Sequence, residues 1–318
     1  MKILITGGAG FIGSAVAKQL MERGDRVVLI DNFNDYYNPR LKEDRIKVFL
    51  KDCRKGYKLY RGDIRDRKFL EKVFTKEKPH KVIHLAAMAG VRASLDNPAL
   101  YADVNVMGTT HLLDLSVKCG VKNFVYASSS SVYGNSKKVP FSETDSVDTP
   151  ISPYAATKKA TELLAHVYSH IHQLKTTGLR YFTVYGPWGR PDMGVFKFIE
   201  NIIRGRTIDV YNFGKMRRNF TYIDDIVSGT IVALDADLPC AVMNIGGDRD
   251  EALLDYIAAV EHSSGKKAKK RLMPIQPGDV PSTVADIRKL KKLGWKPSVR
   301  IQQGVKNFVE WYKWYYKV

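Results

Sequence analysis

The octapeptide TGGAGFIG (6–13) decides the fold of this chain of 318 residues. It follows the short apolar run KILIT (2–6) and begins FIGSAVAKQLMERG (11–24), whose apolar residues have helical spacing. A strand, a glycine-rich turn and a helix in this order are typical of a dinucleotide-binding unit, because the free N–H groups of a helix N-terminus attract phosphates. The sequence therefore predicts a Rossmann-type arrangement from its first residues.

Three glycines of this loop have expected roles. Gly7 permits the tight turn, Gly10 lets a pyrophosphate approach the backbone, and Gly13 lets the helix lie close to the sheet. Phe11 and Ile12 belong to the first turn of the helix, where the positive end of the helix dipole favours phosphate. We expect all five residues to bind the cofactor.

Strand-like apolar runs alternate with helical stretches over the first two thirds of the chain. Buried apolar strands separated by helices predict a parallel sheet that is covered on both faces. The expected strands are 25–31, 81–87, 122–130 and 176–182, and the expected helices are 66–76, 97–119 and a long one from Tyr154.

The pattern loosens after about residue 187, where we expect a smaller lobe at one end of the sheet. Short strands at 207–213 and 242–247 lie there among helices at 193–204 and 250–263. The predicted fold class is α/β, a Rossmann-type doubly wound parallel sheet with a smaller C-terminal α/β substrate lobe. Residues 1–186 would form the cofactor domain, with possible later returns to the sheet, and 187–318 would mainly bind substrate.

Composition narrows the class of protein. The chain has 51 Lys and Arg against 33 Asp and Glu, a formal net charge of +18. A basic surface attracts polyanions, but a face for small anionic substrates explains it better than a nucleic-acid site. No run of about 18 apolar residues is present, and MKILITGGAG predicts no signal peptide. Three widely spaced cysteines predict neither disulfides nor a metal site, which favours the cytoplasm.

An acidic residue at the end of the second strand specifies the cofactor. Asp31 lies 18 residues past Gly13. Its carboxylate can accept both ribose hydroxyls of adenosine and would repel a 2′-phosphate, so NAD is favoured over NADP. Asp63, in GDIRD (62–66), is expected beside the adenine. The other expected cofactor contacts are Asn32, Ile64, Leu85, Ala86, Ala87, Asn105 and Tyr181, together with Tyr154 and Lys158.

The reactive group is predicted from ISPYAATKKA (151–160). Tyr154 and Lys158 lie four residues apart and would share one helix face. By itself this pair is more often an ordinary surface feature. With the cofactor loop it becomes a catalytic set, because the cation and a nicotinamide would lower the pKa of the phenol. A hydroxyl from SSSS (128–131) would complete a Ser–Tyr–Lys arrangement with Tyr154 as the base.

The motifs TGGAGFIG, Asp31, ASSSSVYG and SPYAATK together resemble the extended short-chain dehydrogenase/reductase family over nearly the whole chain. The resemblance implies that Ser129 is the catalytic serine and that Asn105 lies near the active site. Segments 31–46, 88–98 and 180–193 are most similar to UDP-glucuronate 4-epimerases. The resemblance also implies contacts from Arg218 to a diphosphate, from Tyr211 to uracil and from Asp279 to the uridine ribose.

Several residues separate sister activities of that family. Thr183 stands where UDP-galactose 4-epimerases typically have Asn. Sugar-nucleotide 4,6-dehydratases need an acid pair where Ser130 and Ser131 stand here, and UDP-glucuronate decarboxylases usually carry Glu at the second position. Serine hydroxyls can bind a C6 carboxylate that a Glu would repel. Arg190 is either another contact to the carboxylate or sugar, or a surface residue.

The sequence therefore predicts an NAD-dependent epimerase that inverts C4 of UDP-glucuronate to UDP-galacturonate through a transient 4-keto intermediate. One alternative is a 4-epimerase of neutral UDP-hexoses or UDP-N-acetylhexosamines. A rival from another class is a non-catalytic NAD-binding protein with a basic RNA-binding face. The resemblance also implies a homodimer through the helices at 97–119 and 154–175.

Overall fold

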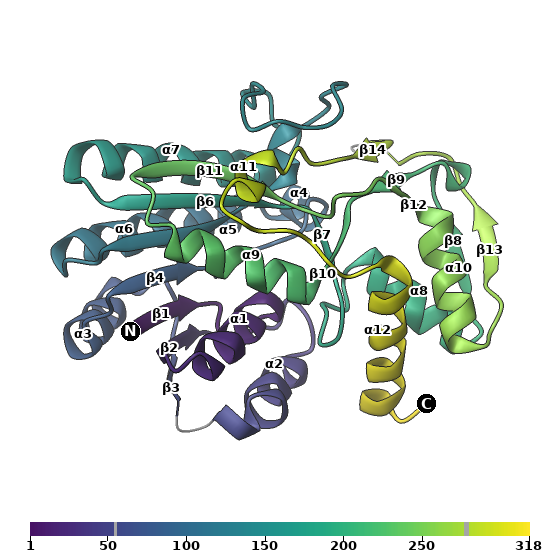
Figure 1. Ribbon diagram of the computed structural model, residues 1–318, viewed down its shortest axis with the longest axis horizontal. Helices are drawn as coiled ribbons and strands as arrows, with labels where there is room; N and C mark the ends of the chain where they lie inside the picture. Colours follow the sequence, from purple (N-terminus) through teal and green to yellow (C-terminus); the bar gives the residue numbers. More distant parts are fainter. Residues whose placement is uncertain (54–55, 277–279) are drawn as a thin grey trace.

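The structure is a computed structural model that describes residues 1–53, 56–276 and 280–318. Its centre is a seven-stranded sheet in the order β11-β6-β5-β4-β1-β2-β3, and every neighbouring pair is parallel. The doubly wound parallel sheet predicted from the sequence is therefore confirmed (Figure 1). Its strands are β1 (Lys2–Thr6), β2 (Arg26–Asp31), β3 (Tyr57–Arg61), β4 (Lys81–His84), β5 (Asn123–Ser129), β6 (Lys175–Tyr181) and β11 (Cys240–Ile245).

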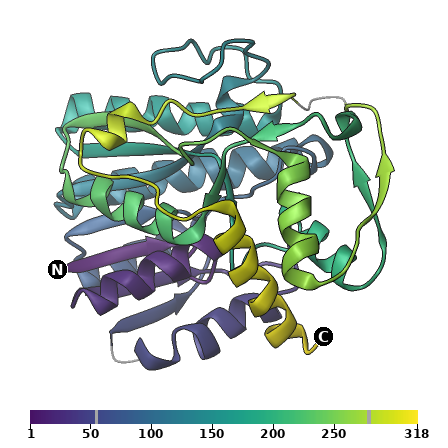
Figure 2. The same cartoon turned by 45° about the vertical axis from the view of Figure 1, so that its right-hand side comes forward.

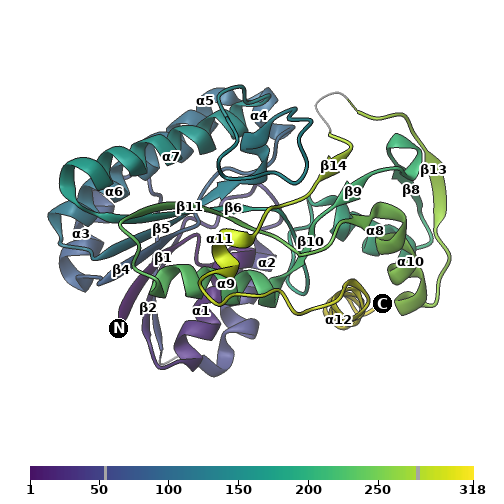
Figure 3. The same ribbon diagram turned by 45° about the horizontal axis from the view of Figure 1, so that its top comes forward.

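Helices cover both faces of this sheet. On one face α3 (Arg67–Glu77), α6 (Gly108–Lys118) and α7 (Pro153–His172) pack side by side, and on the other α1 (Phe11–Glu22) packs against α9 (Ile223–Asp235) (Figure 3). Ile3, Leu4 and Ile5 of the central strand are consequently fully buried, as expected for a strand covered on both sides.

The strand order reverses between β1 and β4. The carboxyl ends of these two strands lie side by side in the sheet. Thr6 is paired with both Ile30 of β2 and His84 of β4. The chain leaves β1 toward one side of the sheet and β4 toward the other, so a crevice opens at their carboxyl ends. This position receives the glycine loop, Asp31 and the residues that follow β4.

The predicted helix 97–119 is built from three pieces: α5 (Pro98–Tyr101), the π-helix η3 (Ala102–Met107) and α6. It is preceded by α4 (Ala93–Asp96). After β2 the chain forms α2 (Arg40–Asp44), the π-helix η1 (Arg45–Phe49) and the 3₁₀ turn η2 (Lys51–Cys53). A π-helical turn changes the direction in which the following side chains point, and such turns often lie at functional sites.

The structure corrects the placement of one strand. We expected 242–247 in the smaller lobe, but β11 pairs with β6 at the edge of the main sheet, because the chain returns there after building the lobe. The chain after residue 187 thus returns to the cofactor domain in β11 and α9. The assignment of the two regions to cofactor and substrate binding stays a prediction.

The remaining elements lie beyond the carboxyl ends of the strands or form the lobe, except the short helix α11 (Arg288–Lys291), which packs against β11 at the edge of the main sheet (Figures 1 and 2). Short pairings join β10 to β7, β9 to β12 and β14, and β13 to β8. These elements are η4 (Ser130–Tyr133), β7 (Thr183–Tyr185), α8 (Gly194–Ile203), β8 (Thr207–Val210), η5 (Asn212–Gly214), β9 (Arg217–Arg218), β10 (Phe220–Tyr222), β12 (Glu251–Ala252), α10 (Leu253–Ser264), β13 (Lys269–Leu272), β14 (Ser282–Thr283), α11 (Arg288–Lys291) and α12 (Ile301–Tyr316).

The C-terminal helix α12 packs into the structure through its aromatic residues. The Trp188 ring lies 5.3 Å from that of Trp311 and 5.2 Å from that of Tyr315, centroid to centroid. The Tyr315 hydroxyl donates to Asp44 at 2.6 Å. The helix thereby fastens the lobe to the segment that follows β2. No helix within the described ranges is long and apolar enough to cross a membrane.

Candidate functional site

The glycine loop has the shape that the sequence predicted. Gly7 has φ +70°, and a Cβ there would lie 2.8 Å from the amide nitrogen of Ala86. A Cβ on Gly13 would lie 2.1 Å from the Gly7 carbonyl oxygen, so α1 can approach only without a side chain. Gly10 is the N-cap of α1 and supplies no side-chain hydrogen bond, which leaves the first N–H groups of the helix available to phosphate. The loop therefore fits a dinucleotide pyrophosphate.

Asp31 holds this loop as well as facing the expected ribose position. One carboxylate oxygen accepts the Ala9 N–H at 3.0 Å and the other accepts the Phe33 N–H at 2.8 Å. A carboxylate has about four acceptor positions, so roughly two remain for ribose hydroxyls. Ribose binding by Asp31 stays a prediction, and the structure adds a role in shaping the loop.

Asp63 is less available than we expected. Its two oxygens accept four hydrogen bonds, three from the backbone and side chain of Arg65 and one from the side chain of Asn32 at 2.9 Å. Burial raises the pKa of Asp63, but these bonds outweigh it and lower the pKa below its ordinary value. A contact between this carboxylate and adenine would require one of these bonds to open, and it remains a prediction.

The other expected cofactor residues border the same crevice. The Leu85 N–H donates to the Thr6 carbonyl at 3.1 Å, and the Ala86 N–H donates to the Thr6 hydroxyl at 3.2 Å. Tyr181 ends β6 opposite Ser129, and its hydroxyl lies 3.0 Å from that of Thr230. Phe11 and Ile12 begin α1, Ala87 follows Ala86, and Ile64 is buried against Gly108 of α6.

Tyr154 lies in the first turn of α7, at the carboxyl end of β5. The helix begins there because the Ser152 hydroxyl accepts the Ala155 N–H at 3.1 Å and Pro153 occupies the first helical position. This start places the phenol close enough to Ser129 for the serine hydroxyl to influence the pKa of the phenol. The structure therefore brings together the serine and tyrosine that the sequence proposed as partners.

The protein's own groups do not lower the pKa of Tyr154. Burial raises it, while the nearby Ser129 hydroxyl and the charge of Arg190 act in the opposite direction and are weaker. The expected lowering by Lys158 was wrong for the protein itself, because Lys158 is not among the groups that lower this pKa. The Lys158 ammonium donates to the Ala127 carbonyl at 2.8 Å. Of the two cations expected to lower the pKa of Tyr154, only the positive charge of a bound nicotinamide remains a prediction.

The pKa of Lys158 is itself shifted from its ordinary value. It is 5% exposed, and burial lowers its pKa from 10.5 to about 8. The nearby His84 is also buried, and that burial, together with the charge of Lys158, lowers the pKa of His84 to about 3. His84 is therefore neutral at physiological pH, and it links Thr6 at 2.7 Å to Thr109 at 2.9 Å.

Asn105 fastens the chain behind the crevice. It lies in the π-helix η3 and is 1% exposed. Its amide group accepts the Met88 N–H at 2.8 Å, donates to the Met88 carbonyl at 3.0 Å, and donates to the Thr157 hydroxyl at 3.1 Å. The side chain thus joins the exit of β4 to the helix that carries Tyr154 and Lys158.

The serine run turns from β5 into η4 at the same place. The Ser129 hydroxyl accepts the Ser131 N–H at 3.1 Å, and the two hydroxyl oxygens lie 3.2 Å apart. Ser130 and Ser131 are both partly exposed at the start of η4. The hydroxyl groups of Ser129 and Ser131 therefore lie together where the chain leaves β5.

A cluster that the sequence did not reveal borders Tyr154 through the ring of Tyr101. The Tyr101 ring lies edge-on to that of Tyr154, 6.2 Å between centroids, and the Tyr101 hydroxyl donates to the Ala89 carbonyl at 2.6 Å. The Tyr36 phenol lies close enough to Tyr101 for each to influence the pKa of the other. The Arg190 guanidinium lies 5.8 Å from the Tyr36 ring and binds Asp192 at 3.0 and 2.5 Å. Tyr36, Tyr101 and Asp192 come from three separate segments, so no local motif could have joined them.

The residues expected to bind substrate are spread along the lobe side. Thr183 begins β7, two residues after the end of β6. The Tyr211 ring lies 5.9 Å from the Arg92 guanidinium, and Arg218 donates to the carbonyl groups of Arg217 at 2.7 Å and Pro281 at 3.2 Å. Asp279 lies outside the described residues. The roles of these residues remain predictions.

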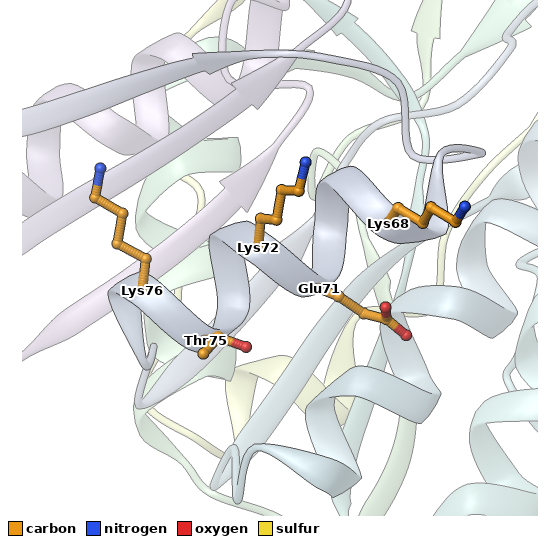
Figure 4. A pocket seen from close by; sticks show the side chains of 5 residues that line it. All are labelled: Lys68, Glu71, Lys72, Thr75 and Lys76. Atoms are coloured by element: carbon orange, nitrogen blue, oxygen red, sulfur yellow. The ribbon is translucent and has the colours of Figure 1, made fainter.

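A surface depression on the outer face of α3 is not a candidate site. It is lined by Lys68, Glu71, Lys72, Thr75 and Lys76, which all come from this one helix (Figure 4). It has no contribution from the glycine loop or from α7. Lysines at four-residue intervals on a helix are typical of a solvated face.

Comparisons with known proteins agree with this geometry. Residues 4–308 match the model of the family described as GDP-mannose 4,6 dehydratase. The chain is 47% identical over 336 residues to Protein CapI of Staphylococcus aureus, covering 100% of each chain. It is 43% identical over 337 residues to the probable UDP-glucuronate 4-epimerase of Rhizobium meliloti, covering 100% of this chain and 98% of that protein.

A solved structure is also similar over the whole length. The UDP-glucuronic acid 4-epimerase from Bacillus cereus, in complex with UDP-glucuronic acid and NAD, superposes with a TM-score of 0.92 at 36% sequence identity. The match covers 99% of this chain and 100% of that chain.

Proposed function

This chain belongs to the GDP-mannose 4,6-dehydratase family of NAD-dependent epimerases and dehydratases, and we propose that it inverts C4 of UDP-glucuronate to give UDP-galacturonate. The resemblance found in the sequence is thereby confirmed, as are its cofactor, NAD, and its class, an isomerase. The identity of the sugar and the roles of individual residues are the proposal.

The groups around Tyr154 support the proposal that the substrate is a sugar with a carboxylate. The Tyr154 phenol is influenced by both the Ser129 hydroxyl and the charge of Arg190, and Ser130 and Ser131 directly follow Ser129. Hydroxyl donors and a guanidinium can bind a sugar carboxylate by charge-assisted hydrogen bonds. A dehydratase or decarboxylase would instead use acidic groups at the serine positions.

In the proposed mechanism the protein positions groups and moves one proton. NAD, when bound, would supply the hydride-transfer chemistry at C4 of the sugar. The glycine loop and Asp31 would hold the dinucleotide, and Tyr154 would accept the proton of the C4 hydroxyl and later return it. Ser129 would donate a hydrogen bond to the reacting oxygen. Lys158, fixed by the Ala127 carbonyl, would hold the cofactor ribose and keep a positive charge nearby.

The test is to incubate the protein separately with UDP-glucuronate, UDP-glucose and UDP-N-acetylglucosamine and to resolve the products by chromatography. UDP-galacturonate should accumulate from UDP-glucuronate, without release of carbon dioxide at a matching rate. Turnover of only the neutral sugars would support the alternative substrate class. Retained NAD with no turnover, together with salt-dependent RNA binding, would support a non-catalytic protein.

We also propose that two chains associate through α7. Leu163, Val167 and Ile171 lie at four-residue intervals and are 55%, 45% and 63% exposed, which forms an apolar stripe on one helix face. Ile171→Glu should convert a dimer into a monomer in light scattering, whereas Lys197→Glu on the lobe should not. A wild-type protein that is monomeric at micromolar concentration would contradict the proposal. A cytoplasmic location remains a prediction from composition.

A further inference from the structure

Arg45 is a buried cation to which the proposed mechanism gives no role. It begins η1, has no exposed surface, and is the largest of the fully buried side chains in the described chain. Its guanidinium makes five hydrogen bonds, and within residues 1–53, 56–276 and 280–318 all five acceptors are neutral oxygens. Burying a cation without a paired carboxylate is costly, so its retention here needs a reason.

The five bonds join three segments that are distant in sequence. One nitrogen donates to the Ala9 carbonyl at 3.1 Å and to the Tyr37 hydroxyl at 2.6 Å. The other two donate to the Trp188 carbonyl at 3.1 and 2.6 Å, and one of them also reaches Gly189 at 3.4 Å. Arg45 therefore connects the cofactor loop, the segment after β2 and the turn that precedes Arg190.

At the cofactor loop Arg45 completes a two-sided clamp. The Ala9 N–H is held by Asp31 at 3.0 Å, and the carbonyl of the same residue is held by Arg45. Ala9 lies between Gly7 and Gly10, where backbone freedom is greatest. Fixing both polar groups of Ala9 removes motion from the part of the loop that faces the phosphates.

At the other end Arg45 fixes a strained turn. Trp188 has φ +63°, an uncommon conformation for a bulky residue, and its carbonyl receives two of the five bonds. Two residues later Arg190 places its charge near the Tyr154 phenol. Both ends of the guanidinium bridge thus lie beside groups that the reaction would use.

We propose that Arg45 is a positioning residue that keeps NAD in its site through turnover and holds Arg190 toward Tyr154. The inference rests on the proposed function, because an epimerase restores its cofactor in every cycle and gains from retaining it. The planar fork of donors makes the bridge, so lysine, with one nitrogen, cannot replace it. The buried positive charge lies beside the loop that would receive the pyrophosphate.

The test measures release of NAD without any sugar nucleotide. Arg45→Lys, Arg45→Met and Tyr37→Phe proteins are loaded with NAD, and its exchange against radiolabelled NAD is followed, with melting temperatures recorded alongside. The control is Arg40→Met, which removes a side chain that is 84% exposed in the same segment. Loss of charge-assisted bonds should speed release about 10-fold or more in both Arg45 variants and about 3-fold in Tyr37→Phe, with no change in the control.

Folded Arg45 variants that release NAD at the wild-type rate would overturn the inference. If neither Arg45 variant folds, unchanged release from Tyr37→Phe would overturn it instead. In Arg45→Lys, kcat for the sugar nucleotide should fall more than its KM changes, because Arg190 loses its place beside the Tyr154 phenol. The exchange assay needs no substrate, so failure of the wild type to convert UDP-glucuronate would refute the proposed function separately.

Discussion

Replacing Asp31 with alanine tests whether the cofactor loop is held by a carboxylate or by its glycines alone. Both oxygens accept backbone N–H groups, from Ala9 at 3.0 Å and from Phe33 at 2.8 Å, and the side chain is 7% exposed. An unsatisfied buried donor costs about 1–3 kcal/mol. Because Phe33 is partly exposed and can bind water, the two losses together predict a fall of roughly 2–4 kcal/mol in the free energy of unfolding of the NAD-free protein.

The same substitution removes the expected acceptor of the adenosine ribose. Hydrogen bonds to a charged group contribute about 1.5–3 kcal/mol each, so loss of one or two predicts an increase in the Kd for NAD of about 10-fold to more than 100-fold. Asp31→Asn keeps one acceptor oxygen and should lose about half as much stability. Affinity for the UDP-sugar should change little.

Urea unfolding of the NAD-free proteins and calorimetric titration with NAD measure the two effects separately. Asp35→Ala is the matched control, because Asp35 lies in the same segment and is exposed. If Asp31→Ala unfolds at the wild-type urea concentration, the clamp on Ala9 has no energetic importance. If its affinity for NAD is also unchanged, the ribose is held elsewhere.

Three further outcomes are expected. Tyr154→Phe should abolish epimerisation with almost no change in melting temperature, since one hydroxyl is lost; substantial residual turnover would remove Tyr154 from the role of base. Burial lowers the pKa of Lys158 to about 8, below its ordinary value of 10.5, so between these values the unfolded chain binds the proton more tightly. The free energy of unfolding of the NAD-free protein should therefore rise from about pH 8 to 10.5, and a Lys158→Met protein whose curve rises equally would contradict this. Asp192→Asn should free Arg190 to hold an acidic sugar more tightly, which lowers KM and kcat together; an increase in KM would show that Arg190 does not face the sugar.

The parts of the site that could be predicted from the sequence are those set by local pattern. The positive φ of Gly7 and the close approach at Gly13 follow from backbone sterics within one strand–turn–helix unit. The place of Tyr154 follows from a helix start signalled by Ser152 and Pro153. In a parallel sheet these features meet, because the carboxyl ends of neighbouring strands share one edge.

The parts that could not be predicted depend on contacts between distant segments. The sequence of β11 has the pattern of any short apolar strand. Only its pairing with β6 places it in the main sheet. The spacing of Tyr154 and Lys158 predicts a shared helix face but not the Ala127 carbonyl that takes the ammonium away from the phenol. Asp63 likewise follows the expected motif, yet Arg65 and Asn32 occupy its oxygens.

The contacts available to the cofactor are more firmly fixed than those available to the sugar, and this difference fits the proposed reaction. At the cofactor end, the loop is fixed through both polar groups of Ala9 by two buried charged residues. At the sugar end, the guanidinium of Arg190 is already paired with Asp192, so a sugar carboxylate must compete for it. The surrounding groups are hydroxyls of partly exposed serines, which form weaker and exchangeable bonds. If C4 is to be reduced from the face opposite to that from which it was oxidised, the sugar must turn while the dinucleotide stays in place. Strong fixed contacts on the cofactor and weak replaceable ones on the sugar permit that turn, because binding energy that held the sugar in one orientation would raise the barrier to the other.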